Sequence, residues 1–135
     1  MTVPVSATPV RVLVVDDSVP FREALHDLID GVVEFVWTGE ACSGQDAVEQ
    51  TLRMRPDLVL MDVRMPGIGG IEAAAQIASQ PLPPVLVLIT GADLPTAVPS
   101  GTAAEILAKH RLNRAALTRL WEVHGHQSQD PAAAV

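Results

Sequence analysis

Short apolar runs alternate along this chain with stretches in which apolar residues recur every three or four positions. A short run rich in Val and Leu is typical of a strand buried on both faces of a sheet, whereas the longer spacing is typical of a helix with one buried face. The runs predict five strands, near residues 10–15, 34–38, 57–62, 85–90 and 104–108.

Four helices are expected around these strands. The first follows Ser18, and the second follows Ser43 and stops before Pro56. The third covers about 70–79, and the fourth follows Asn113. Side chains of Ser and Asn accept hydrogen bonds from a first helical turn, so the three positions are predicted N-caps. The faces predicted to be buried hold Phe21, Leu25, Leu28 and Ile29; Ala47, Val48, Thr51 and Leu52; Ile71, Ala74, Ala75 and Ala78; and Ala116, Leu117, Leu120 and Trp121.

The segment between the fourth and fifth strands interrupts this alternation. Residues 91–101 contain two prolines and two glycines, so we expect a helix here to be short, displaced or absent. Elsewhere strands and helices alternate with short connections. This predicts a single α/β domain with a doubly wound five-stranded parallel sheet, helices on both faces, and all strands ending at one edge.

Carboxylates stand at the ends of two of the buried strands, Asp16 and Asp17 after the first and Asp62 at the end of the third. Ionised carboxylates are costly inside such strands, so we expect them at the C-terminal edge, where open α/β sheets bind ligands. Three carboxylates at one place repel one another, and Mg²⁺, which prefers oxygen ligands, would relieve the repulsion. The alternative is that Asp16 and Asp17 merely cap the next helix.

Two further polar residues are expected at the same edge. Thr90 ends the fourth strand and Lys109 follows the fifth. A hydroxyl and an ammonium are the groups that bind the oxygens of a phosphoryl group. Taken alone, Thr90 is an ordinary strand end and Lys109 a solvated charge. Together with the three acids they indicate a site for phosphoryl transfer.

Composition limits the classes of function. The chain has 135 residues, 48% of them apolar and 19% charged, as in a globular domain, which we place at residues 10–124 between flexible tails at 1–9 and 125–135. A net charge of −7 argues against direct binding of nucleic acid. The lone Cys42 and the lack of a signal peptide or membrane span predict a cytoplasmic protein without membrane attachment.

Four segments of the sequence resemble the receiver domain of bacterial two-component response regulators. They are Val12 to Ser18, Asp62 to Gly70 (DVRMPGIGG), Thr90-Gly91 and Lys109. The resemblance extends from Val10 to about Val123 and is closest to receivers of the LuxR/NarL type. It implies a flavodoxin-like fold, and it makes the chain a signalling protein rather than an enzyme.

The resemblance also implies roles for single residues. Asp62 would accept a phosphoryl group from a sensor histidine kinase, with Lys109 and Thr90 contacting that group. Mg²⁺ would be held by Asp16, Asp17, Asp62 and the backbone carbonyl of Arg64. The downstream effector or output domain stays unknown, and the oligomeric state stays open, with a homodimer as one outcome.

The sequence departs from the family pattern at three places. His110 stands where a proline, often behind a cis peptide bond, usually follows the lysine, so we expect a trans bond here. Ile106 stands where the family has a switch aromatic, and residues 91–108 are shorter than usual and rich in proline. Signalling would therefore run through a remodelled surface, or phosphorylation would change the conformation little.

Two other functions are compatible with the same residues. One is a protein-interaction module that works without phosphorylation, with the acid cluster as a remnant. The other is a Mg²⁺-dependent phosphohydrolase with an aspartyl nucleophile. Such enzymes usually carry a second acid two residues after the nucleophile, and this chain has Arg64 there.

Overall fold

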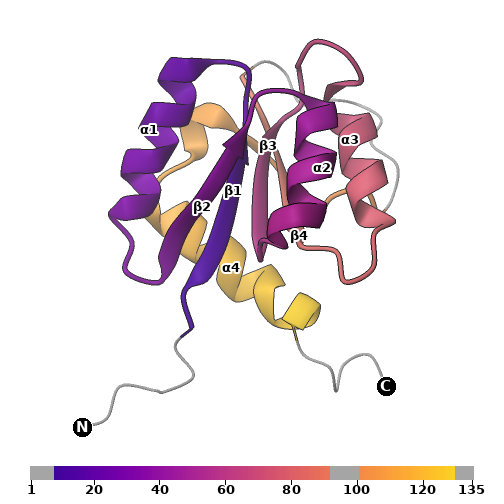
Figure 1. Ribbon diagram of the computed structural model, residues 1–135. Helices are drawn as coiled ribbons and strands as arrows, with labels where there is room; N and C mark the ends of the chain where they lie inside the picture. Colours follow the sequence, from indigo (N-terminus) through magenta and orange to yellow (C-terminus); the bar gives the residue numbers. More distant parts are fainter. Residues whose placement is uncertain (1–7, 92–100, 130–135) are drawn as a thin grey trace, which may run out of the picture.

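The sheet contains the five predicted strands. In this computed structural model, which describes residues 8–91 and 101–129, they run parallel in the order β2-β1-β3-β4-β5 (Figure 1). This is the strand order of the flavodoxin-like fold. The bounds are β1 (Val10–Val15), β2 (Phe35–Ala41), β3 (Leu58–Asp62), β4 (Val85–Thr90) and β5 (Glu105–Ala108).

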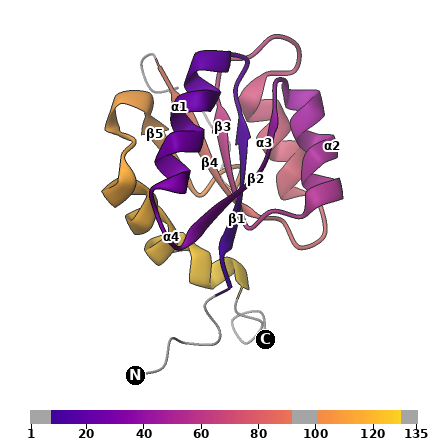
Figure 2. The ribbon, with the colours of Figure 1, turned by 60° about the vertical axis from the view of Figure 1, so that its left-hand side comes forward.

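Helices cover both faces of the sheet, as the alternation predicted. Helices α1 and α4 lie on one face, and α2 and α3 lie on the other (Figure 2). Two apolar cores result, one on each side of the strands. The bounds are α1 (Val19–Asp30), α2 (Gly44–Met54), α3 (Gly69–Ala78) and α4 (Arg114–Gln129), with a 3₁₀ turn, η1, at Lys109–Arg111.

The three predicted N-caps are confirmed. The Oγ of Ser18 accepts the N–H three residues later at 3.4 Å, and Ser43 does the same at 3.1 Å. The Oδ1 of Asn113 accepts the N–H of the third residue after it at 2.8 Å. Each side chain satisfies one N–H that a first helical turn leaves without a partner in the helix, so these helices begin where the sequence predicted.

The predicted inward face of α3 was partly wrong. Ala74 is buried, but Ala75 and Ala78 face solvent, and Ala73 and Ile77 take their place in the core. The reason is Gly70, because a Cβ there would lie 2.1 Å from the carbonyl oxygen of residue 62. That close approach turns the Gly70 side of the helix toward the sheet, and residues three, four and seven positions later follow it.

One smaller expectation also failed: Leu52 of α2 is 53% exposed although it was predicted to face inward. The last helix continues to Gln129, into the segment 125–135 that was predicted to be a flexible tail. The ring of Trp121 packs over Gly125 in this helix, and a Cβ at Gly125 would lie 2.5 Å from it. The rest of that tail and residues 1–7 lie outside the described residues, as do residues 92–100, where a short or displaced helix was expected.

Candidate functional site

The ends of β1 and β3 bring three carboxylates together. These strands are neighbours, and their register places Val15 beside Met61, so that the acids that follow each strand meet. One side-chain oxygen from each of Asp16, Asp17 and Asp62 lies within 4.8 Å of the others. The predicted convergence is therefore confirmed. It falls between β1 and β3, where connections leave the sheet in opposite directions and open α/β sheets bind their ligands.

Asp16 is completely buried, and its backbone and side chain are both held in place. Its Oδ1 accepts the N–H of Ser18 at 2.7 Å, and its own N–H donates to the carbonyl of Ala41 at 3.1 Å. The guanidinium of Arg22 donates to its carbonyl oxygen and also pairs with Glu40. Helix capping alone does not explain Asp16, because its second oxygen, Oδ2, contacts the ammonium of Lys109.

The ammonium of Lys109 connects two of the acids. Its Nζ lies 2.9 Å from Oδ2 of Asp16 and 3.4 Å from Oδ2 of Asp62. Burial lowers the pKa of Lys109, but the hydrogen bond and charge of Asp16 and the charge of Asp62 outweigh it, so its pKa lies above the usual value. The ammonium therefore stays charged and balances part of the negative charge of the cluster.

Asp62 is only 7% exposed at the end of β3. Burial raises the pKa of its carboxyl above the ordinary 3.8, the N–H of Arg64 and the ammonium of Lys109 lower it, and the charge of Asp16 raises it further. The Arg64 N–H donates to Oδ1 at 3.2 Å, while Oδ2 faces Lys109. The two oxygens are thus held by different partners.

Thr90 ends β4, and Lys109 directly follows the neighbouring strand β5 at the same edge of the sheet. Thr90 is buried, pairs in register with Ala108, and comes directly after Ile89, which pairs with Asp62. The structure therefore places all five predicted side chains at the ends of four adjacent strands. Sequence reasoning missed Phe21 and Arg22 in the first turns of α1; the ring of Phe21 lies under the Lys109 ammonium, 4.1 Å from Nζ to the ring centroid.

The loop after Asp62 depends on glycines. Gly67 and Gly69 have φ angles of +86° and +75°, which residues with a Cβ rarely adopt. The N–H of Gly70 then donates to the carbonyl of Val63 at 2.9 Å. The loop closes tightly beside Asp62, and α3 begins next to the acid cluster.

The donor set fits a small hard cation. In an octahedral Mg²⁺ site with bonds of about 2.1 Å, ligand oxygens lie about 3 Å apart when adjacent and about 4.2 Å apart when opposite. Three carboxylate oxygens within 4.8 Å, one from an exposed residue, approach that spacing and leave room for water. All are hard oxygen ligands, so chemistry and spacing agree with the predicted ion.

A sequence model of the response regulator receiver domain family matches residues 12–120 of the chain. The chain belongs to this family. The strand order is that of the fold the resemblance implied, and Lys109 lies beside the acid cluster at the carboxyl edge of the sheet.

Relatives of this receiver domain include longer proteins. The transcriptional regulatory protein PdtaR of Mycobacterium tuberculosis is 44% identical over 84 residues, which cover 62% of this chain and 40% of PdtaR. A protein-glutamate methylesterase/protein-glutamine glutaminase of Pyrococcus abyssi is 39% identical over 85 residues, 62% of this chain and 23% of that protein. The match thus spans less than half of either relative.

Solved receiver structures have the same fold. The response regulator domain of Thermotoga maritima CheB has a TM-score of 0.76 and 27% identity, and covers 85% of this chain and 96% of its own. The receiver domain of the response regulator NarL from Mycobacterium tuberculosis has a TM-score of 0.73 and 32% identity, and the match covers 90% of this chain and 98% of that structure. CheY in the CheX-CheY-BeF₃-Mg complex of Borrelia burgdorferi has a TM-score of 0.73 and 26% identity, and the match covers 85% of this chain and 89% of that structure.

The departures of this receiver are visible around β5. His110 lies in η1, and the peptide bond before it is trans, as expected, since no cis bond occurs among the described residues. Ile106 is half-buried and packs against the core on the α2–α3 face. No helix in residues 8–91 and 101–129 is long and apolar enough to cross a membrane.

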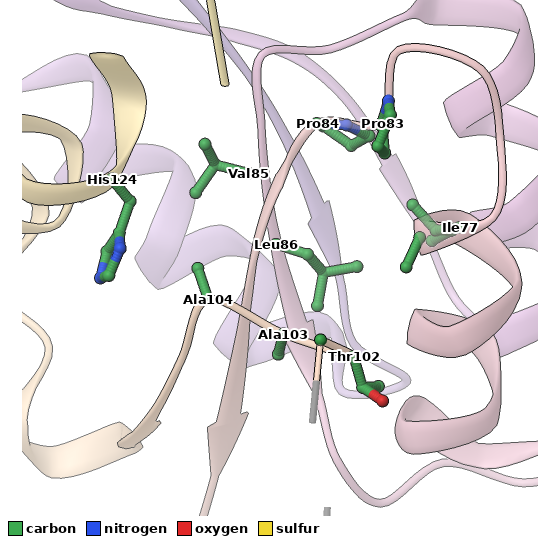
Figure 3. A pocket seen from close by; sticks show the side chains of 11 residues that line it. Ile77, Pro83, Pro84, Val85, Leu86, Thr102, Ala103, Ala104 and His124 are labelled. Atoms are coloured by element: carbon green, nitrogen blue, oxygen red, sulfur yellow. The ribbon is translucent and has the colours of Figure 1, made fainter. Parts of the chain in front are cut away.

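A cavity of about 280 Å³ lies at the opposite end of β4 from Thr90. Figure 3 shows Ile77 of α3, Leu86 of β4 and His124 of α4 around it, beyond the start of β5. None of the five predicted site residues lines it. The cavity therefore has no part in the chemistry of the acid cluster.

Proposed function

We propose that Asp62 of this receiver domain accepts a phosphoryl group from a phosphohistidine on a sensor histidine kinase. The observation that carries the proposal is the Lys109 ammonium, which lies within 3.4 Å of both Asp16 and Asp62 at the shared edge of the sheet. A phosphoryl group arriving at Asp62 brings oxygens that need such a cation.

The chain's own groups fit each part of the transfer. An oxygen of Asp62 attacks phosphorus, the P–N bond to the histidine breaks, and its electron pair returns to the imidazole. The Arg64 N–H orients Oδ1 of Asp62, at 3.2 Å. Lys109 then turns from the carboxylates to the phosphoryl oxygens, and the Thr90 hydroxyl donates from the next strand.

Asp16, Asp17, Asp62 and the carbonyl of Arg64 would hold Mg²⁺. Asp17, the exposed member, would bind it directly, and Asp16 largely through water. The bound ion supplies positive charge against the oxygens that gather during the transfer. Two observations support this assignment: the oxygens within 4.8 Å of one another, and the Mg²⁺ named with BeF₃ in the related CheY complex.

The chain would act as the substrate of a kinase and change its protein contacts, rather than act as an enzyme. Its acidic balance, −7 overall, makes a protein the expected partner and not nucleic acid. The lone Cys42 agrees with a reducing cytoplasm. Whether the chain forms a homodimer stays a prediction, and the effector stays unidentified.

Phosphorylation can be tested with a small donor. The protein is incubated with Mg²⁺ and acetyl phosphate, and its intact mass is measured with and without a chelator. We expect the mass of one phosphoryl group to be added, and to be absent with the chelator or in Asp62→Asn. Beryllofluoride, which mimics the phosphoryl group, should shift amide NMR signals at the ends of β1, β3 and β4 in the wild type only.

The alternatives give different results. A protein-interaction module with a remnant cluster would show no adduct and no Mg²⁺-dependent shifts. An aspartyl phosphohydrolase would release phosphate from free phosphomonoesters over many turnovers. Either result would overturn the proposed role of Asp62.

A further inference from the structure

Lys109 is the only lysine of the chain, and its ammonium touches more than the two acids. The face of the Phe21 ring lies below Nζ, 4.1 Å from the nitrogen to the ring centroid. We propose that Phe21 is a positioning residue, which holds the Lys109 ammonium at the acid cluster through a cation–π contact. The inference deepens the proposed function, and its kinetic part rests on that function.

The Lys109 ammonium has three contact partners. Asp16 and Asp62 lie 2.9 Å and 3.4 Å from Nζ, and the Phe21 ring supports it from another side. The stem of the lysine passes Gly91, where a Cβ would lie 3.5 Å from Cδ. An aromatic face attracts a cation without accepting a directed hydrogen bond. It therefore supports the ammonium without competing for the protons that the carboxylates bind.

The backbone around Lys109 lies in short elements, so it does little to fix the position of the side chain. The residue follows β5, a short strand at the edge of the sheet, and opens the three-residue turn η1. At the end of that turn the N–H of Leu112 donates to the carbonyl of Lys109 at 3.1 Å. A lysine side chain loses rotamer entropy when it is fixed in one position. Contacts made by the side chain must offset that cost, and the Phe21 ring is one of them.

Phe21 itself is well fixed. Its own N–H donates to Oγ of Ser18, the N-cap of α1, and its ring packs against the core on the α1–α4 face. The next residue, Arg22, donates to the carbonyl of Asp16. One turn of α1 thus holds both the acid and the ammonium. During phosphoryl transfer the ammonium moves from carboxylate to phosphoryl oxygens, and a flat ring can support it in both positions.

The first test observes Lys109 directly. Lysine labelled with ¹³C gives a single set of NMR signals, because the chain has no other lysine. Ring currents should shift the Lys109 Hε protons upfield from those of free lysine. Phe21→Leu should move them back toward the free value, and Phe21→Tyr, which keeps the ring, should preserve the shift. Leu28→Ala is the matched control, because Leu28 packs on the same core from the same helix.

The second test measures the rate of labelling by acetyl phosphate with Mg²⁺. Phe21→Leu should slow it about three- to tenfold, the size expected for a partly desolvated cation–π contact. Phe21→Tyr and Leu28→Ala should stay within about twofold of the wild type. Equal slowing in Phe21→Leu and Leu28→Ala would show a general loosening of the fold and overturn the inference.

The two tests fail separately. If the wild type takes no phosphoryl group, the proposed function is wrong, while the NMR comparison still decides whether Phe21 positions Lys109. If the wild type is labelled but Phe21→Leu leaves the Hε shift and the rate unchanged, only the positioning role is wrong.

Discussion

Two regions of the sheet, the carboxyl ends of the inner strands β1 and β3 and the edge strand β5, differ in how firmly they are built. At the ends of β1 and β3, Asp16 and Asp62 are buried and each is held by a backbone N–H as well as by Lys109. The edge strand β5 has four residues, of which only Leu107 is buried, and a cavity lies beyond its start. The region that would receive a phosphoryl group is buried and held by several contacts, whereas the region that would transmit it is more exposed.

The same difference appears in the electrostatics. Asp62 is an acid whose pKa is raised, chiefly by burial, so its charge costs stability. Glu105 of β5 is an acid whose pKa is lowered, chiefly by the hydrogen bond from Arg119, which lies 2.7 Å away. A charge that costs stability although it has partners is typical of a functional site, whereas the charge of Glu105, paired with Arg119, stabilises the fold.

The largest expected effect is on the loop that follows Asp62 at the end of β3. Gly70→Ala should lower the free energy of unfolding by about 3 kcal/mol, because a Cβ would lie 2.1 Å from a backbone oxygen. Gly67→Ala is the matched control, since its Cβ would meet nothing and only its φ of +86° is strained, which costs about 1 kcal/mol. Urea unfolding measures both, and equal losses would show that the loop beside Asp62 is not tightly packed.

The second prediction concerns Asp62 and pH. Its folded pKa lies above the unfolded value, so the carboxyl stabilises the fold at low pH and the benefit is lost as pH rises through the folded pKa. Without Mg²⁺, Asp62→Asn should therefore be more stable than the wild type at neutral pH, by about 1 kcal/mol. The gain should vanish toward pH 3. A variant less stable than the wild type at pH 7 would contradict the sign.

Glu105 should show the opposite dependence, with a smaller effect. Its folded pKa lies below the unfolded value of 4.5, so its contribution is present above that pH and is lost as pH falls through the folded pKa. Glu105→Gln should cost about 0.5 kcal/mol at pH 7, a small value because the pair with Arg119 is exposed, and nothing at pH 2.5. Unfolding curves at several pH values test it, and a constant loss would show that the charge is irrelevant.

The smallest change in stability, below about 0.5 kcal/mol, is expected for Ile106→Tyr, because Ile106 is half-buried. The informative measurement on this variant is NMR. With Mg²⁺ and beryllofluoride, amide shifts in the wild type should gather at the ends of β1, β3 and β4, whereas the tyrosine variant should extend them into β5 and α4. If the wild type already shows large shifts in β5 and α4, this region transmits without an aromatic residue.

Local patterns in the sequence determined most of the architecture. Apolar runs and helical spacing predicted the five strands and the helices on both faces, and Ser18, Ser43 and Asn113 predicted where three helices begin. The acids were predictable too, because a carboxylate that ends a buried strand must lie at the edge of the sheet. These features depend on residues close together in the chain.

Only the tertiary structure decided features that depend on distant segments. The close approach of Gly70 to the carbonyl of Asp62 fixed the rotation of α3, and the Trp121 ring packs over Gly125 in α4. The placement of Phe21 under Lys109 joins residues 88 positions apart, and no local pattern carries it (109 − 21 = 88). Which side chains meet across a sheet is set by packing, and packing is a property of the folded chain as a whole.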